Sequence, residues 1–227
     1  AVYTEDKIQL TEKSLRGMAA SGLIIIGTAR PFLTEWSANL GLNLMQIGDM
    51  DEVAILNSIP TAEGAVQIAM EEMDSTIHGC NAVVLGCGRV GTTLARLLKN
   101  LGAYVTVVSR ERAELARAYE IGCQRVELQN IAEVVIGADV IFNTIPAVVL
   151  GTEILRRLSY DTLIIDLASA PGGTDFETAN DCGIKAILAP GLPGKVAPQM
   201  AGKILADVVP RLLIESMTKA GQKLLLA

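Results

Sequence analysis

From residue 81 onward, short apolar runs alternate with longer stretches in which apolar residues recur every three or four positions. Continuous apolar runs are typical of strands buried on both faces, and the periodic stretches are typical of helices that cover such strands. We predict strands over 81–85, 104–109, 125–128, 139–143, 163–167 and 185–189. Helices are predicted between them, over 90–101, 111–121, 130–137, 148–158 and 174–182. This alternation predicts right-handed βαβ connections and an α/β fold with a doubly wound parallel sheet.

The first sixty residues predict a second, smaller α/β lobe. Thr11 is placed to cap a helix that runs through Ala20, and Pro31 lies in the first turn of another helix. Short strands are predicted over 23–26, 43–47 and 53–56. These are too few for a complete lobe, and the chain has no initiator Met. We therefore expect a truncated lobe that begins partway into a longer protein.

Two helices are predicted to join the lobes. Residues 57–64 form a polar, turn-rich bridge, and a linker helix follows it to about residue 74. A last helix with an apolar stripe, over 197–218, is expected to cross back to the small lobe. The predicted domains are 1–60 (small lobe), 61–75 (linker), 76–195 (large domain) and 196–227 (C-terminal helix).

A glycine triplet links the first strand of the large domain to its first helix. Gly86, Gly88 and Gly91 have the GxGxxG spacing, which is a weak signal alone and a strong one in a strand–turn–helix context. The first glycine permits a tight turn, the second lets the backbone approach a pyrophosphate, and the third lets helix and strand pack closely. Amides at the helix start, near Arg89 and Val90, would then face the anion. The pattern predicts a Rossmann-type dinucleotide-binding domain; the alternative is an ordinary glycine-rich turn.

The end of the second strand bears on the choice of cofactor. Enzymes that bind NAD place an Asp or Glu about twenty residues after the glycine loop, where it binds the ribose 2′-hydroxyl. Here Ser109 stands 18 positions after Gly91, and Arg110, Glu111 and Arg112 follow it. A hydroxyl and two guanidiniums suit a 2′-phosphate, so we expect NADP, with NAD as the alternative.

The loops after the fourth and fifth strands should lie beside the same crevice. Asn143 and Thr144 are candidates for binding the cofactor ribose, and Ile145 and Pro146 for enclosing the nicotinamide. Asp166 is a further candidate for cofactor binding. The alternative for these loops is a purely structural role.

Candidates for substrate binding and catalysis are spread over both lobes. Lys195 follows two Pro-Gly turns and could neutralise a carboxylate or transfer a proton, and Arg30 is a second candidate carboxylate ligand. Ser169 lies at the crevice edge. Ser58 and Thr61 are candidate catalytic hydroxyls on the bridge, with helix capping as the alternative. The only histidine, His78, precedes the first strand and so lies at the opposite edge of the sheet, where it cannot act as the crevice acid or base.

Composition excludes several other classes of function. The net charge of −6 and the scattered basic residues do not suit a nucleic-acid surface. No apolar run reaches the roughly 18 residues that a membrane span needs. The four cysteines show no metal-ligand spacing and are interpreted as reduced thiols of a cytoplasmic protein, so no metal is expected.

With these motifs in view, the chain resembles the family of the dipicolinate synthase A subunit. The resemblance rests on residues 57–64, 76–79, 86–91, 143–146, 165–169, 171–176 and 189–198. It implies oxidation of dihydrodipicolinate, a small dicarboxylate, to dipicolinate with NAD(P), together with the flavoprotein-like dipicolinate synthase B subunit. It also implies a hetero-oligomer in the mother cell of a sporulating bacterium, and an N-terminal segment that is absent here.

Two other functions stay open. One is a dehydrogenase similar to the 2-hydroxyacid and alanine dehydrogenases, and the other is a nucleotide-binding partner subunit without turnover of its own. Aromatisation of the dihydropyridine ring drives hydride loss, so the resemblance does not require a crevice histidine.

Overall fold

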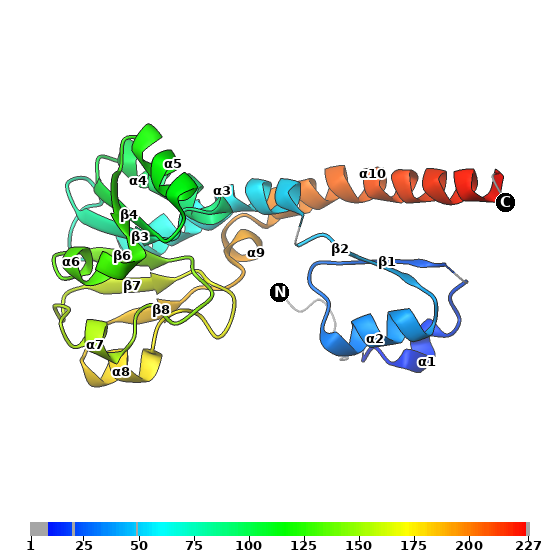
Figure 1. Ribbon diagram of the computed structural model, residues 1–227, viewed down its shortest axis with the longest axis horizontal. Helices are drawn as coiled ribbons and strands as arrows, with labels where there is room; N and C mark the ends of the chain where they lie inside the picture. Colours follow the sequence, from blue (N-terminus) through cyan, green and yellow to red (C-terminus); the bar gives the residue numbers. More distant parts are fainter. Residues whose placement is uncertain (1–8, 20, 49, 226–227) are drawn as a thin grey trace. The chain divides into compact units, whose positions relative to one another are not determined.

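The computed structural model describes residues 9–19, 21–48 and 50–225. The chain divides into two compact units. The first comprises residues up to Val53 together with those from Val208 onward, and the second comprises Ala54–Asp207. Helices α3 (Asp51–Glu72) and α10 (Pro198–Leu225) each span a boundary between the units (Figure 1).

The second unit is built on a six-stranded parallel sheet with the order β5-β4-β3-β6-β7-β8. Its strands are β3 (Asn81–Leu85), β4 (Tyr104–Ser109), β5 (Gln124–Glu127), β6 (Val140–Asn143), β7 (Leu163–Asp166) and β8 (Ala186–Leu188). The chain winds outward from β3 in one direction and then outward from β6 in the other. The order therefore reverses between β3 and β6, where open α/β sheets place their ligand crevice. The predicted doubly wound Rossmann-type sheet is confirmed.

Helices cover both faces of this sheet (Figure 1). Besides α3, they are α4 (Arg89–Asn100), α5 (Arg112–Glu120), α6 (Ile131–Val135), α7 (Thr152–Leu155), α8 (Phe176–Asp181) and α9 (Leu192–Val196), with a 3₁₀ turn at Leu128–Asn130. Along β3, Val84 joins a core cluster that includes residues of α3 and α4, while Val83 and Leu85 join a cluster that includes residues of α6, α7 and α8. Successive residues of a strand point to opposite faces, so a continuous apolar run supplies both cores.

Helix α3 corrects the prediction for the residues before the sheet. The expected strand at 53–56 and the turn-rich bridge at 57–64 are both wrong, because the helix runs unbroken through Pro60. The linker helix predicted after the bridge is confirmed as far as Glu72. Its small apolar residues Ala62, Ala65 and Ala69 recur at helical spacing and are fully buried in the core. This packing outweighs the helix-breaking tendency of the proline.

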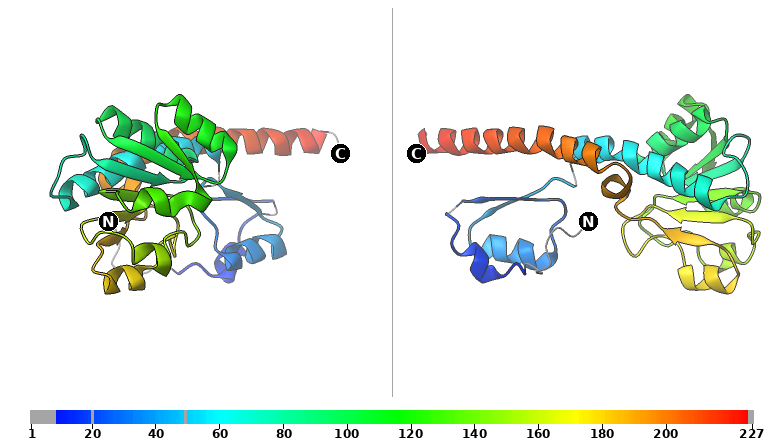
Figure 2. Two further views of the ribbon diagram at one scale, coloured as in Figure 1. Left: turned by 60° about the vertical axis from the view of Figure 1, so that its left-hand side comes forward. Right: turned by 180° about the vertical axis from the view of Figure 1, so that it is seen from behind.

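The first unit holds a two-stranded parallel sheet of β1 (Leu23–Ile26) and β2 (Asn43–Gln46). The strands predicted over 23–26 and 43–47 are confirmed to within one residue. Helix α2 (Pro31–Asn39) connects the two strands (Figure 2). Its Leu33 belongs to a core cluster against which residues of both strands pack. Thr11 caps α1 (Glu12–Leu15), but this helix ends well before the predicted end at Ala20, a residue outside those described.

A buried carboxylate fixes the loops after β6 and β7. Asp166 is fully buried and accepts hydrogen bonds from Asn143 Nδ2, the Ala168 and Gly173 amides and the Thr174 hydroxyl, at 2.8 to 3.0 Å. Four donors compensate for the lost hydration of this side chain. The two loops therefore hold one fixed shape at the carboxyl edge of the sheet.

We expect Gly173→Ala to destabilise the protein by about 3 kcal/mol or more, above the usual cost of overpacking a core. A Cβ at residue 173 would lie 2.5 Å from both Asn143 Nδ2 and the Ile145 carbonyl oxygen. The matched control is Gly137→Ala, because a Cβ there meets nothing within 4 Å. Urea unfolding of the two variants measures the difference, and equal midpoints would contradict this account of the loop.

Candidate functional site

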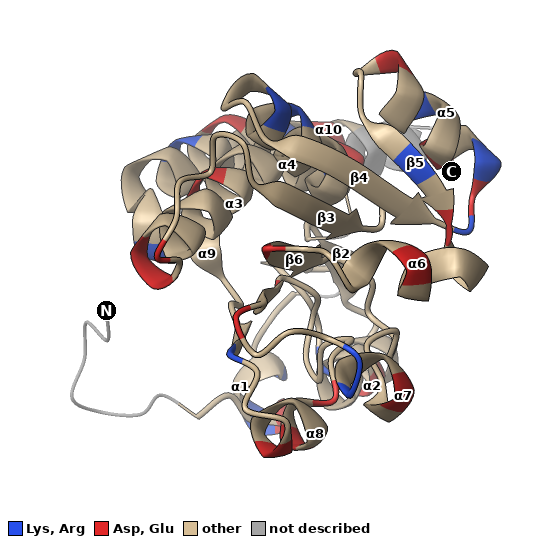
Figure 3. Cartoon of the chain, turned by 90° about the vertical axis from the view of Figure 1, so that its left-hand side faces the viewer, with Lys and Arg blue, Asp and Glu red and all other residues tan. Residues whose placement is uncertain are grey.

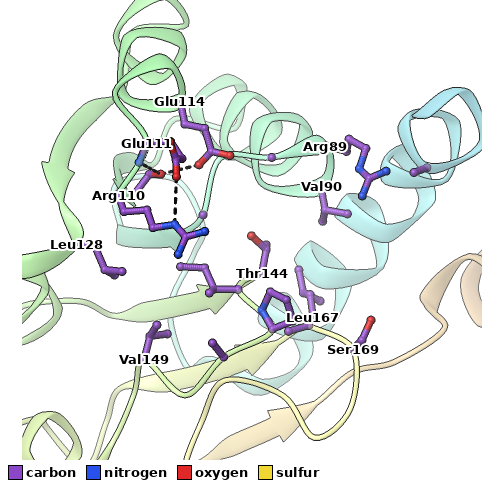
Figure 4. A pocket seen from close by; sticks show the side chains of 18 residues that line it. Arg89, Val90, Arg110, Glu111, Glu114, Leu128, Thr144, Val149, Leu167 and Ser169 are labelled. Atoms are coloured by element: carbon purple, nitrogen blue, oxygen red, sulfur yellow. Dashed lines mark hydrogen bonds and ion pairs between the residues drawn. The ribbon is translucent and has the colours of Figure 1, made fainter. Parts of the chain in front are cut away.

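A cavity of about 590 Å³ opens at the carboxyl edge of the sheet, within the second unit. This volume is in the range typical of small-molecule and cofactor sites. Figure 4 shows the side chains that surround it. The lining comes from the loop after β3 and the first turn of α4, the end of β4, the start of α5 and the loops after β6 and β7, with one residue each from α3 and the 3₁₀ turn. Its members are Ala54, Gly86, Gly88, Arg89, Val90, Ser109, Arg110, Glu111, Glu114, Leu128, Thr144, Ile145, Pro146, Ala147, Val149, Leu167, Ala168 and Ser169.

A different feature of the local geometry explains why glycine stands at each of the three positions of the loop. Gly86 adopts a φ of 88°, which side chains disfavour, and a Cβ there would lie 2.5 Å from the Thr144 hydroxyl. A Cβ at Gly91 would lie 2.1 Å from the Gly86 carbonyl oxygen. A Cβ at Gly88 would have only Glu114 Oε1 within 4 Å, at 3.8 Å. Gly86 and Gly91 therefore serve the fold, while Gly88 leaves space for a ligand.

The loop delivers the start of α4 to the cavity. Gly88 is the N-cap residue and no side chain caps the helix, and Arg89 and Val90 of its first turn line the cavity. The first amides of a helix lack partners within the helix and face along the positive end of its dipole. This arrangement suits the pyrophosphate of a dinucleotide.

One end of the cavity carries a carboxylate that the strand-end pattern does not predict. Glu114 Oε2 accepts a hydrogen bond from the Ser109 hydroxyl at 2.6 Å and another from the Cys87 amide at 3.1 Å. Ser109 Oγ in turn accepts from the Glu111 amide at 3.0 Å. Arg110 lies beside them and pairs with the Glu111 carboxylate at 3.1 Å, as Figure 4 shows. Ser109 and Arg110 thus line the cavity together with the acidic residues Glu111 and Glu114.

Arg112 does not line this cavity. It lines a separate hollow with Leu115, Arg125 and Glu127. Figure 3 shows acidic and basic positions interspersed on α5 and the segment before it. Of the two arginines predicted for a 2′-phosphate, the structure brings only Arg110 to the cavity.

The other end of the cavity is mostly apolar. Thr144, Ile145 and Pro146 line it, with Leu167 and Ser169 across the loop after β7. The Thr144 hydroxyl donates to the Leu85 carbonyl at 2.7 Å, so its proton is already used. Asn143 and Asp166, both predicted to bind the cofactor, are fully buried beneath these loops and bond to each other.

Several predicted catalytic and substrate residues lie outside the lining. Ser58 is buried in α3, where its hydroxyl donates to the Ile55 carbonyl at 2.6 Å. The Thr61 hydroxyl donates to the Asn57 carbonyl at 2.7 Å. Lys195 is exposed in the last turn of α9. Arg30 belongs to the first unit, where it precedes α2.

The single cysteine of the glycine loop is a poor candidate for a nucleophile. Burial raises the pKa of the Cys87 thiol, a hydrogen bond with Thr92 lowers it, and the Glu114 carboxylate raises it again. Since the thiolate is the reactive form, a raised pKa disfavours reactivity.

Within residues 9–19, 21–48 and 50–225, no cluster of three or more His, Cys, Asp or Glu side chains is placed to hold a metal ion. Over the same residues, every helix is too short or too polar to cross a bilayer.

Comparisons with known proteins agree with this geometry. The model of the NAD-binding domain of D-isomer-specific 2-hydroxyacid dehydrogenases matches residues 59–168. The dipicolinate synthase A subunit of Bacillus subtilis is 42% identical over 221 residues, which cover 97% of this chain and 74% of that protein. The crystal structure of the dipicolinate synthase A subunit from Bacillus halodurans superimposes with a TM-score of 0.91 at 43% identity, over 93% of this chain and 73% of that one. A transhydrogenase from Sinorhizobium meliloti shares the fold at a TM-score of 0.73 and 17% identity, over 89% of this chain and 70% of that one.

The fold, the glycine loop and the matched domain define a dehydrogenase-type protein that binds a nicotinamide dinucleotide. Within that class, the chain belongs to the family of the dipicolinate synthase A subunit.

We expect Gly88→Val to weaken dinucleotide binding by more than tenfold, about 1.4 kcal/mol, without loss of stability. The new methyl groups would occupy the space over the loop, while the extended backbone of residue 88 accepts a side chain. Gly151→Val is the control, since Gly151 is also an extended N-cap with nothing within 4 Å of its Cβ position. Calorimetric titration and thermal unfolding measure the two effects. Unchanged binding by the Gly88 variant would place the cofactor elsewhere.

Proposed function

We propose that this chain, together with the dipicolinate synthase B subunit, oxidises dihydrodipicolinate to dipicolinate with NADP as the hydride acceptor and NAD as an alternative. The observation that carries the proposal is a cavity at the switch point of the sheet in a chain 42% identical to a dipicolinate synthase A subunit. The substrate loses a hydride to C4 of the nicotinamide and a proton from its ring. Aromatisation supplies the driving force, so the task of the protein is to orient donor and acceptor.

The residues divide into two proposed groups. The glycine loop and the first turn of α4 hold the diphosphate, and Ile145 and Pro146 enclose the nicotinamide next to Ser169. Lys195 and Arg30 are proposed to supply positive charge to the two substrate carboxylates. In this proposal residues 76–195 form the dinucleotide-binding domain, and the protein works in the cytoplasm of the mother cell.

A second candidate function follows from the family model that matches residues 59–168. A 2-hydroxyacid dehydrogenase would reduce a keto acid and would need an acid or base in the crevice. The only histidine, His78, lies before β3 at the amino edge of the sheet, beside the turn at Gly102. This arrangement favours a reaction driven by aromatisation.

The direct test is to incubate the purified chain with dihydrodipicolinate and NADP⁺ or NAD⁺, with and without the B subunit. We expect the absorbance of reduced nicotinamide to rise when the B subunit is present. Turnover of simple 2-keto acids instead would favour the 2-hydroxyacid dehydrogenase. Cofactor binding with no turnover under any condition would favour a non-catalytic partner subunit.

We expect Arg110→Ala to weaken NADP binding more than tenfold and to leave NAD binding nearly unchanged. A charge-assisted hydrogen bond to a phosphate is worth about 1.4 kcal/mol or more, which corresponds to that factor. Arg112→Ala is the matched control, because Arg112 faces a different hollow. Titration of both variants with both cofactors measures the effect. A loss shared by NAD and NADP would argue against a 2′-phosphate contact at Arg110.

A further inference from the structure

The Glu114 carboxylate reaches the cavity from the first turn of α5. One of its oxygens, Oε2, is bonded to both the Ser109 hydroxyl and the Cys87 amide. The other oxygen, Oε1, has no hydrogen bond from the described residues and lies 3.8 Å from a Cβ position built on Gly88. The side chain is therefore fixed by one oxygen and presents the other over the glycine loop (Figure 4).

Glu114 lies close to the position at which NAD-binding domains of this fold carry an acidic side chain that binds the cofactor. There a carboxylate near the end of the second strand accepts a hydrogen bond from the adenosine ribose. In this chain the second strand of the large sheet, β4, ends on Ser109, which has no charge to offer. Glu114 stands 23 positions after Gly91 and brings a carboxylate back over that strand end.

We propose that Glu114 is the specificity-determining residue that lets NAD compete with NADP in this site. Its free oxygen would accept a hydrogen bond from the ribose 2′-hydroxyl of NAD and would repel the 2′-phosphate of NADP. The inference rests on the proposed dinucleotide binding and adds to it the residue that sets the cofactor preference.

The state of Ser109 supports this assignment. Its hydroxyl gives its proton to Glu114 and accepts from the Glu111 amide, and the residue is only 2% exposed. It therefore has no proton left for a phosphate oxygen while Glu114 is charged. Arg110 is the one cation at this end of the described lining, and it is paired with Glu111. A 2′-phosphate carrying roughly two negative charges would meet two carboxylates and one guanidinium.

The test compares Glu114→Gln with the parent chain. A Gln side chain can keep both hydrogen bonds at its carbonyl oxygen and replaces the free oxygen by an NH₂ group, so the shape is kept and the charge is removed. We expect the ratio of NADP affinity to NAD affinity to rise at least tenfold, measured by titration with NAD⁺ and NADP⁺. A purely structural lesion would weaken both cofactors equally and leave the ratio unchanged.

Glu120→Gln is the control for net charge. Glu120 is also on α5 and pairs with Arg117 at 3.4 Å, but it does not line the cavity. For the Glu120→Gln variant we expect the ratio of NADP affinity to NAD affinity to stay within about twofold of the parent value.

Three outcomes separate the proposals. A ratio that does not change in the Glu114→Gln variant, with both cofactors bound, overturns the role of Glu114 and leaves the proposed function standing. Equal shifts in the Glu114 and Glu120 variants also overturn it, because they would reflect overall charge. Failure of the parent chain to bind either cofactor overturns the proposed function and this inference with it.

Discussion

The close approach of Gly91 to the Gly86 carbonyl oxygen is the constraint on which the rest of the site depends. A Cβ on Gly91 would lie 2.1 Å from that oxygen, so only glycine lets α4 begin directly against the end of β3. The same turn is tied on its other side, where the Thr144 amide and hydroxyl both donate to the Leu85 carbonyl, at 2.9 and 2.7 Å. The helix start, the central strand and the loop after β6 are thus fixed together. A cavity at the switch point, bordered by a helix start that no side chain caps, follows from this contact.

The strands of the large sheet could be predicted closely because they are buried on both faces. Residues 81–85 and 104–109 form strands over the whole predicted ranges, and the other strand ends differ by no more than one position. Helix α3 could be predicted only in its second half. The predicted linker helix begins at residue 61, whereas α3 begins at Asp51 and runs through Pro60. Proline and polar residues near 57–61 are typical of a turn, so the local pattern places the start of the helix after them.

The site residues likewise include some that could be predicted from the sequence and some that could not. Loops after parallel strands share one edge, so the positions near Gly86 and Thr144 could be expected at the cavity. Glu114 could not, because the motif places its acid at the strand end and this one comes from the first turn of a helix. It stands 23 residues after Gly91, but spacing alone does not say that its side chain turns back toward Ser109. Arg112, two positions after Arg110, is already the first residue of α5 and faces another hollow.

The cavity is lined by few positively charged side chains, which limits the ligands that it can bind without help from other residues. Among the described lining residues, the cations are Arg89 at the glycine loop and Arg110 at the end with the acidic residues. The loops after β6 and β7 contribute apolar and hydroxyl groups, and the side chain of the buried Asp166 beneath them is fully engaged in hydrogen bonds. This lining suits a nicotinamide ring better than two carboxylates. In the proposed function, a dicarboxylate substrate would therefore need cations from outside this lining, and Lys195 is the candidate within the same unit.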